Sequence, residues 1–158
     1  MNAKWITPVV TAFDAEGHVD LEANKRIYEH LIQGGMDGIL ILGSIGEFFA
    51  ISMEEKKKLI DTAVSYINKR VTLYVGTNCM ILKDCIELSN YAIEKGADAV
   101  MVISPYYFNL PHDSVINFYD QVADNVNGPV LLYNFPDRTG YDLSAQLILE
   151  LVRKHRNI

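Results

Sequence analysis

Three short segments combine residue types that can bind and transform a small organic anion. The first, Gly43-Ser44-Ile45-Gly46-Glu47, places small residues between two glycines. Glycine lets the backbone turn tightly, and such a turn presents N–H groups that suit a carboxylate or phosphate oxygen. The same pattern also occurs in strand-to-helix turns that hold no ligand, so both interpretations stay open on this segment alone.

The other two segments carry phenols and a guanidinium. In one, Tyr106 and Tyr107 are adjacent, so one ring can pack while the other presents its hydroxyl at a pocket or a subunit contact. In the other, Tyr133 precedes Arg138. Together they would supply a phenol that can carry a proton and a guanidinium that can bind a substrate carboxylate through two hydrogen bonds. The alternatives are ordinary loop packing for the tyrosines and a surface ion pair between Arg138 and Asp137.

Each segment follows an apolar run that is typical of a buried parallel strand. Strands covered on both faces lose the alternation of apolar and polar residues. The predicted strands are residues 39–42, 71–75, 99–103 and 130–133, and residues 5–11 form an earlier member of the series. Their ends recur about every thirty residues, which indicates a repeated structural unit.

Amphipathic stretches with helical period separate the strands, for example over residues 59–67 and 116–126. Ser52-Met-Glu-Glu55 has the form of a capping box, which predicts a helix start. Gly34-Gly35, Gly96 and Gly128 lie where a left-handed cap would end a helix. The strict alternation of strand and helix predicts a parallel sheet with right-handed crossovers.

Two architectures satisfy that alternation: a doubly wound open sheet and a TIM (β/α)₈ barrel. The chemically unusual residues favour the barrel, because they follow several different strands instead of gathering at one switch point. A barrel with this repeat needs on the order of 250 residues. We therefore predict an α/β fold with one partial barrel domain over residues 1–158, in which the first five β/α units are present and the barrel is incomplete.

The composition limits the classes of binding partner that we expect. The net charge is −6, and no basic stripe is available to neutralise phosphates, so we expect neither a nucleic acid nor a membrane as partner. No apolar run approaches the roughly 20 residues that span a bilayer, and no signal-peptide segment is present, which predicts a cytoplasmic protein. Cys79 and Cys85 are expected to be reduced packing residues. The four histidines lie far apart, so no metal site is predicted.

Together these motifs resemble the pyruvate-dependent class I aldolases, the family that contains dihydrodipicolinate synthase, N-acetylneuraminate lyase and the 2-keto-3-deoxy sugar-acid aldolases. The resemblance runs from Thr7-Pro-Val-Val-Thr-Ala-Phe13 to Tyr133-Asn-Phe-Pro-Asp-Arg-Thr-Gly140. It implies a (β/α)₈ barrel, assembled as a homodimer or homotetramer, and no cofactor beyond a covalent Schiff base between pyruvate and a lysine on the sixth strand. The imine becomes an enamine whose carbon attacks an aldehyde, and the lyases run the reaction backwards.

The resemblance also assigns roles to five residues. Tyr133 matches the tyrosine that hydrogen-bonds the Schiff base and shuttles protons. Ser44 matches the hydroxyl that links it to a second tyrosine, and Tyr107 matches that second tyrosine, which in the family comes from the neighbouring subunit. The N–H groups of Ser44 and Ile45 match the cradle for the pyruvate carboxylate. Arg138 matches the arginine that the synthases use on the carboxylate of aspartate semialdehyde.

The sequence departs from the family pattern in two respects. Ile45 stands where the synthases usually carry threonine, so one hydroxyl to the carboxylate is lost. The matching sixth strand would begin where Arg156-Asn157-Ile158 leaves off, so the Schiff-base lysine is missing here. Lys154 is no substitute, because it ends an amphipathic stretch at a position where a cation faces solvent. The chain as given is therefore expected to be inactive alone.

The resulting hypothesis is a lyase that condenses pyruvate with an aldehyde. Arg138 favours dihydrodipicolinate synthase, an enzyme of lysine biosynthesis also called 4-hydroxy-tetrahydrodipicolinate synthase. Ile45, Phe48 and Phe49 favour the alternative, a 2-keto-3-deoxy sugar-acid aldolase or an enzyme like N-acetylneuraminate lyase. A second alternative is a non-catalytic truncated module, whose unpaired strand edges would invite association.

Overall fold

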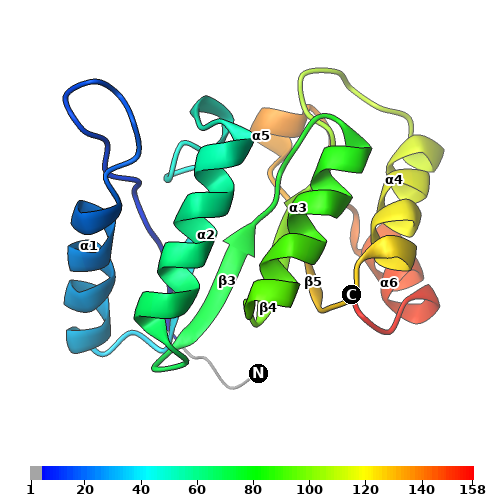
Figure 1. Cartoon of the computed structure of the whole chain (residues 1–158). Helices are drawn as coiled ribbons and strands as arrows, with labels where there is room; N and C mark the ends of the chain where they lie inside the picture. Colours follow the sequence, from blue (N-terminus) through cyan, green and yellow to red (C-terminus); the bar gives the residue numbers. More distant parts are fainter. Residues whose placement is uncertain (1–4) are drawn as a thin grey trace.

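The computed structural model describes residues 5–158 and shows five parallel strands in one sheet, in the order β1-β2-β3-β4-β5 (Figure 1). The strands are β1 (Ile6–Pro8), β2 (Gly38–Ile41), β3 (Thr72–Gly76), β4 (Ala99–Ile103) and β5 (Val130–Tyr133). Four of them lie where the apolar runs predict strands. The first is shorter than predicted, because the chain leaves the ladder after Val9 N donates to Leu40 O at 3.0 Å.

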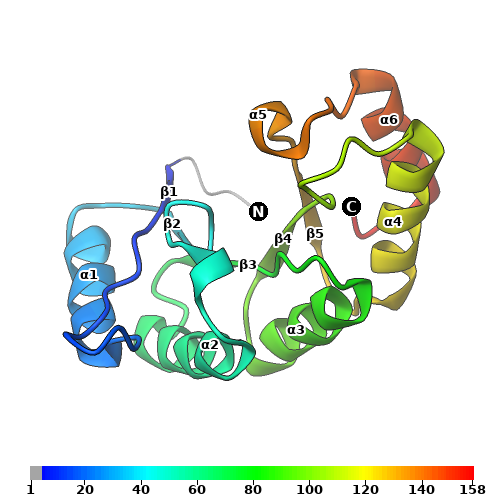
Figure 2. The same cartoon turned by 90° about the horizontal axis from the view of Figure 1, so that it is seen from above.

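A helix follows each strand, so the chain is a series of five β/α units. The five long helices are α1 (Leu21–Gln33), α2 (Met53–Ile67), α3 (Leu82–Lys95), α4 (His112–Asn125) and α6 (Ala145–Lys154). Two short elements, η1 (Phe48–Ala50) and α5 (Pro136–Thr139), lie between a strand and its long helix. Seen from above, the sheet is curved and the long helices form an arc along its outer face (Figure 2).

The main core lies between the sheet and this arc of helices. Ile39, Ile41, Val100 and Val102 point to the helices and have no exposed surface. The positions between them, such as Leu40 and Met101, are only half-buried. Tyr74 and Ile103 on the same face are buried, so the prediction of buried strands holds for most positions of β3 and β4. No helix of the described chain lies over the concave face, which leaves the other positions partly exposed (Figure 2).

The helix stripes pack as their period predicts. Leu59, Ile60, Ala63 and Ile67 of α2 are all buried. Each large aliphatic side chain removed from water in this way stabilises the fold by about 1.5–3 kcal/mol. The stripe therefore fixes which side of the helix meets the sheet.

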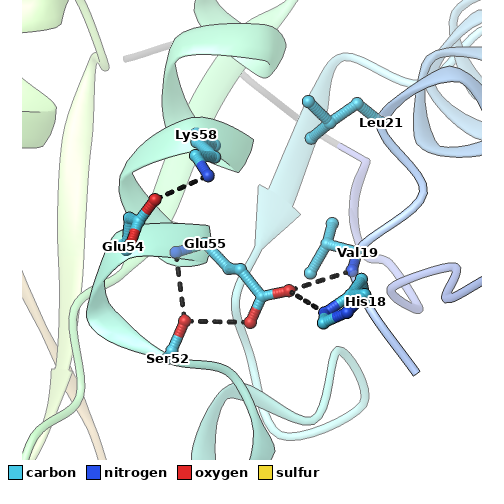
Figure 3. A pocket seen from close by; sticks show the side chains of 7 residues that line it. All are labelled: His18, Val19, Leu21, Ser52, Glu54, Glu55 and Lys58. Atoms are coloured by element: carbon cyan, nitrogen blue, oxygen red, sulfur yellow. Dashed lines mark hydrogen bonds and ion pairs between the residues drawn. The ribbon is translucent and has the colours of Figure 1, made fainter. Parts of the chain in front are cut away.

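The capping box at Ser52 forms and connects two units (Figure 3). Ser52 Oγ accepts from Glu55 N at 3.3 Å, and the Glu55 carboxylate accepts from Val19 N at 3.2 Å. The open groove of about 580 Å³ at this place is also lined by Glu54 and Lys58, which pair with each other at 2.7 Å. The polar side chains in this groove form hydrogen bonds and an ion pair with one another and with the loop before α1. These contacts hold that loop against α2.

Two of the predicted glycine caps are left-handed, and one prediction is wrong. Gly96 ends α3 with φ 119°, and Gly35 follows α1 with φ 83°. By contrast, α4 ends at Asn125 with an extended Val126, so Gly128 caps no helix. Gly128 is needed for a different reason: a Cβ there would lie 2.7 Å from side-chain atoms of Ile93.

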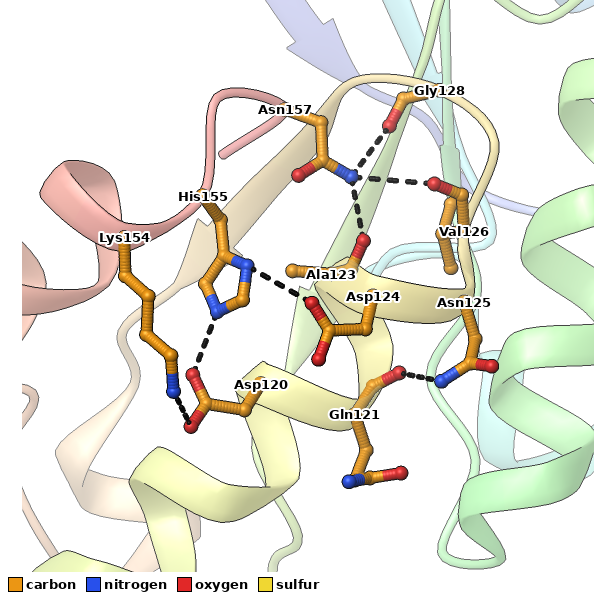
Figure 4. Close-up of polar contacts among 10 residues, drawn as sticks. All are labelled: Asp120, Gln121, Ala123, Asp124, Asn125, Val126, Gly128, Lys154, His155 and Asn157. Carbon is orange, nitrogen blue, oxygen red and sulfur yellow. Dashed lines mark hydrogen bonds and ion pairs between the residues drawn. The ribbon is translucent and has the colours of Figure 1, made fainter.

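A polar cluster fastens the end of α6 to α4 (Figure 4). Asp120 accepts from Lys154 Nζ at 2.5 Å and lies 2.7 Å from His155 Nε2, and the His155 ring is almost fully buried. Asn157 adds hydrogen bonds from its Nδ2 to the carbonyls of Ala123 and Val126. Lys154 thus lies at the helix end as predicted, but its ammonium binds Asp120 instead of facing only solvent.

Within residues 5–158, no helix is long and apolar enough to cross a membrane. The same residues contain no group of three or more His, Cys, Asp or Glu side chains arranged to hold a metal ion.

We predict that Asp120→Asn lowers the free energy of unfolding by about 2 kcal/mol at pH 7, because it breaks charge-assisted hydrogen bonds in a half-buried site. Burial raises the pKa of Asp120, but hydrogen bonds from Lys154 and His155 outweigh it and hold the pKa below its usual range. A depressed carboxyl pKa stabilises the fold above the unfolded-state value of about 3.9, and this contribution is lost as the pH falls through the folded-state value. Urea unfolding of both proteins at pH 7 and pH 3 measures it.

The matched control is Asp124→Asn. Its side chain is 62% exposed and lies 3.4 Å from His155 Nδ1, so we expect a change below about 0.5 kcal/mol. Equal losses in the two variants, or a loss in Asp120→Asn that does not shrink at low pH, would contradict this account of the cluster.

Candidate functional site

Ser44 and Tyr133 meet at the carboxyl ends of their strands. Ser44 follows β2 and Tyr133 ends β5, and their hydroxyl oxygens are 3.5 Å apart across 89 positions of sequence. This separation is at the outer limit for a hydrogen bond, and either oxygen can donate. Both side chains are half-buried. The structure therefore brings together two of the three residues for which the sequence predicts a proton path.

A small cavity lies beside this hydroxyl pair on the concave face of the sheet. It measures about 170 Å³. Its lining comes from strands or strand ends of four units: Pro8, Leu40, Gly43, Ser44, Ile45, Met101 and Tyr133. This volume is below the range of about 300–1,000 Å³ that is usual for drug-sized ligands, so the cavity suits a molecule of few atoms.

The turn after β2, which lines part of this cavity, contains two backbone N–H groups without an acceptor among residues 5–158. Gly46 N donates to Gly43 O at 3.0 Å, and Glu47 N donates to Ser44 O at 3.2 Å. Among the hydrogen bonds of residues 5–158, none uses the N–H of Ser44 or of Ile45. Unpaired N–H groups at a tight turn bind anions without a cation. The carboxylate cradle at the N–H groups of Ser44 and Ile45 therefore stays a prediction, with both groups unpaired in the described chain.

Ile45 contributes only apolar atoms to the site. Its side chain is 55% exposed and forms part of the cavity lining. It can exclude water from a ligand but cannot hydrogen-bond one.

The two adjacent tyrosines separate as the sequence predicts. Tyr106 packs edge-on against Phe48, with ring centroids 6.0 Å apart. Tyr107 is 83% exposed, has the left-handed φ of 84°, and contacts Phe108 with ring centroids 4.8 Å apart. Within the described chain its hydroxyl reaches neither Ser44 nor Tyr133. The contribution of Tyr107 to a neighbouring subunit's site stays a prediction.

Arg138 is part of α5, the short helix that follows β5, and is exposed. Its guanidinium is 5.8 Å from the ring centre of Phe135, and that ring lies 5.5 Å from the ring of Tyr133. Residues 5–158 supply no ion-pair partner for Arg138, so the alternative of a surface pair with Asp137 is not what the structure shows. The guanidinium is therefore exposed and has no ion-pair partner within the described residues.

The sequence interpretation missed the inward-facing strand residues and one buried hydroxyl. Pro8 and Leu40 are partners in the β1–β2 register, and Met101 pairs with Gly76. Within fully apolar runs nothing distinguishes the inward positions, although alignment of the strands in register would identify them. Thr11 donates its hydroxyl to Gly46 O at 2.7 Å, and only its position after the first strand could have suggested this.

Both cysteines are free thiols near this rim, as predicted. Burial raises the pKa of Cys85 to about 12, and burial also raises the pKa of Cys79 although Lys56 opposes it. Raised values mean little thiolate at neutral pH, so neither thiol has the character of a nucleophile.

A parallel sheet that curves around ligand-binding groups at the carboxyl ends of its strands is the arrangement of β/α-barrel enzymes. The sequence profile described as "Dihydrodipicolinate synthetase family" matches residues 1–158, and the chain belongs to this family. The family consists of pyruvate-dependent lyases.

Several curated proteins are similar to the chain. It is 40% identical over 153 residues to YagE of Escherichia coli K12, whose name assigns it to the 2-dehydro-3-deoxy-D-gluconate aldolases. It is 34% identical over 148 residues to a 4-hydroxy-tetrahydrodipicolinate synthase of Oceanobacillus iheyensis. These alignments cover 97% and 94% of the chain but 51% and 50% of the relatives. The chain spans about half the length of the curated relatives it matches.

Solved structures agree on the fold. The crystal structure of YagE in complex with pyruvate superposes with a TM-score of 0.96 at 39% identity, covering 100% of the chain and 53% of YagE. Dihydrodipicolinate synthase from Aquifex aeolicus superposes with a TM-score of 0.94 at 31% identity, covering 99% and 53%. The predicted fold is thus confirmed: the five units match the N-terminal part of the TIM-barrel fold of this family.

We predict that iodoacetamide at pH 8 leaves Cys85 unmodified in the native chain. A thiol pKa of about 12 leaves on the order of a thousandfold less thiolate than in a free cysteine. Cys79 should react slowly, and both should react at the same rate in urea. Mass spectrometry of timed samples measures this, with Cys79→Ser as the control that isolates Cys85. Rapid labelling of Cys85 in the native chain would contradict the conclusion that this thiol is buried.

Proposed function

We propose that this chain supplies the pyruvate-binding and proton-transfer half of a Schiff-base (class I) aldolase. One observation carries the proposal: the hydroxyl pair of Ser44 and Tyr133 lies beside a small cavity that is also lined by Ile45, and the N–H groups of Ser44 and Ile45 have no acceptor among residues 5–158. A 2-keto acid needs this combination, with donors for its carboxylate and a proton carrier at its carbonyl. The complex of the similar protein YagE with pyruvate supports the choice of ligand.

In the proposed mechanism, the N–H groups of Ser44 and Ile45 hold the carboxylate of pyruvate. A lysine amine attacks the carbonyl carbon, and Tyr133 delivers a proton to the oxygen as it leaves as water. The resulting imine loses a methyl proton to Tyr133 and becomes an enamine, whose carbon forms a bond to the aldehyde carbon while the aldehyde oxygen takes up a proton. Water then hydrolyses the imine, which releases the product and the lysine amine. Ser44 keeps the phenol of Tyr133 oriented and passes its proton onward.

The lysine is proposed to lie in polypeptide outside residues 5–158. None of the residues that line the cavity is a lysine. Lys154 is held by Asp120 at the far end of α6. We therefore expect the described residues to position the substrate and its protons but to form no imine by themselves.

A dimer or tetramer is part of the proposal because of Tyr107. Its exposed ring is held on a left-handed backbone that a tyrosine rarely adopts. Such backbone persists where the surrounding structure requires it, often at functional sites. A neighbouring subunit would receive this hydroxyl at its own Ser44 and complete the proton path.

For the aldehyde we propose aspartate semialdehyde, which would make the complete enzyme a 4-hydroxy-tetrahydrodipicolinate synthase of lysine biosynthesis. Arg138 supports this choice, because its guanidinium is exposed, has no carboxylate partner among residues 5–158, and lies 5.8 Å from the ring of Phe135, which is next to Tyr133. A second candidate is a 2-dehydro-3-deoxy sugar-acid aldolase. The apolar side chain of Ile45 in the cavity lining and the 40% identity to YagE favour it.

Borohydride reduction in the presence of pyruvate tests the reaction class. We expect a stable pyruvyl adduct on the complete polypeptide that carries this sequence and none on residues 1–158 alone. Tyr133→Phe should lower kcat at least a hundredfold, because general acid–base catalysis contributes about 10²–10⁴-fold.

Tyr91→Phe is the matched control, since the Tyr91 hydroxyl bonds to Asp61 on the outer surface and should not affect kcat. An adduct on the 158-residue chain would refute the external lysine. Unchanged kcat in Tyr133→Phe would refute the role of the phenol.

Arg138→Ala separates the two aldehydes. If aspartate semialdehyde is the substrate, its KM should rise about 10- to 100-fold while the KM for pyruvate stays unchanged, because a charge-assisted bidentate contact is lost. Arg153→Ala, which removes an exposed arginine from α6, is the control. An unchanged KM for aspartate semialdehyde would favour the sugar-acid aldolase instead.

A further inference from the structure

The turn that carries Ser44 begins and ends on unusual backbone. Leu42 has φ 55° and Glu47 has φ 53°, both in the left-handed region. Side chains larger than glycine rarely adopt this region, because the Cβ atom crowds the carbonyl oxygen. Leu42 is also fully buried, so its conformation cannot be relieved by moving into solvent. The surrounding structure must therefore hold the turn in this shape.

On one side the turn is shaped by β3. A Cβ built on Gly76 would lie 2.1 Å from the carbonyl oxygen of Leu42, far inside any permitted contact. Gly76 is not itself left-handed, so glycine is required there for space and not for conformation. The close approach lets the Leu42 carbonyl occupy the position that its left-handed backbone dictates.

On the other side the turn is held by the segment after β1. The Thr11 hydroxyl donates to Gly46 O at 2.7 Å in a buried position. Gly46 also approaches the neighbouring backbone, since a Cβ there would lie 2.9 Å from Val9 O. The turn thus packs closely between β3 and the segment after β1, and the hydrogen bond from Thr11 holds its Gly46 end.

We infer that Thr11 and Gly76 are positioning residues that hold the Leu42–Glu47 turn in its strained shape and thereby aim the Ser44 hydroxyl and the N–H groups of Ser44 and Ile45 into the cavity. The inference rests on the proposed function for its ligand, a 2-keto carboxylate. Neither residue lines the cavity, so both act through the turn. The strained backbone is the physical reason: without its restraints the turn relaxes, and the donors no longer converge.

The test uses two substitutions of one residue in the complete polypeptide that carries this sequence. Thr11→Val keeps the shape and removes the hydroxyl, whereas Thr11→Ser keeps the hydroxyl. We expect Thr11→Val to weaken pyruvate binding about tenfold and to speed hydrogen exchange at the amides of Gly46 and Glu47, which close the turn. Thr11→Ser should restore both quantities to within about twofold of the original protein.

Two further variants check the strain. Gly76→Ala should weaken pyruvate binding more than Thr11→Val, because the new Cβ displaces the Leu42 carbonyl. Asn68→Gly relieves another left-handed residue, φ 45° at the end of α2, which precedes β3 and so lies toward the amino ends of the strands, away from the turn. It should leave the pyruvate Kd unchanged, which separates effects on the turn from general effects of backbone strain.

Each outcome decides the inference. Unchanged pyruvate binding in Thr11→Val, or a Thr11→Ser variant as weak as Thr11→Val, would overturn it. If the original protein binds no pyruvate, the proposed function fails. Hydrogen exchange at Gly46 and Glu47 then decides alone: faster exchange in Thr11→Val that Thr11→Ser reverses supports the restraint, and unchanged exchange overturns it.

Discussion

The curvature of the sheet is the constraint on which the site depends. Ser44 and Tyr133 follow β2 and β5, which have two strands between them. In a flat sheet, strands three steps apart are separated by about 14 Å, well beyond the reach of a serine and a tyrosine pointing out of the plane. Their hydroxyl oxygens are nevertheless 3.5 Å apart, because the sheet curls and its concave face turns the two strand ends toward each other (Figure 2). The curvature of the sheet is therefore what creates a common site.

The side chains of the site are held in position by different kinds of contact. Tyr133 is part of a strand, so the ladder and the ring of Phe135 define its direction. Ser44 lies on an irregular turn and depends on restraints from both neighbouring strands. Arg138 and Tyr107 lie on more exposed segments, which suits groups that meet a second substrate or a second subunit. Arg138 and Tyr107 are thus more exposed than Ser44 and Tyr133, as is common for functional residues on loops that strands carry.

The sequence predicts the strand and helix pattern well, because apolar runs and helical stripes are local signals that the packing reinforces. It also predicts that the functional residues gather at the strand ends, which is a property of parallel sheets. It fails where the decisive contact joins residues that are distant in sequence. Gly128 is required by the side chain of Ile93, and Gly76 by the carbonyl of Leu42. The hydrogen bond from Thr11 to Gly46 likewise joins positions 35 residues apart. The residue type glycine or threonine does not identify the distant residue that it contacts, so such contacts are visible only in the three-dimensional structure.

The central claim is that Ser44 and Tyr133 act as one hydrogen-bonded unit. A double-mutant cycle measures this directly, with Ser44→Ala, Tyr133→Phe and the double variant assayed for kcat with pyruvate in the complete polypeptide. Groups in direct contact show coupling energies of about 0.5–3 kcal/mol, whereas independent sites are additive. The account predicts that the double variant loses scarcely more activity than Tyr133→Phe alone. Strictly additive losses would contradict it, because they would mean that the two hydroxyls do not share a proton path.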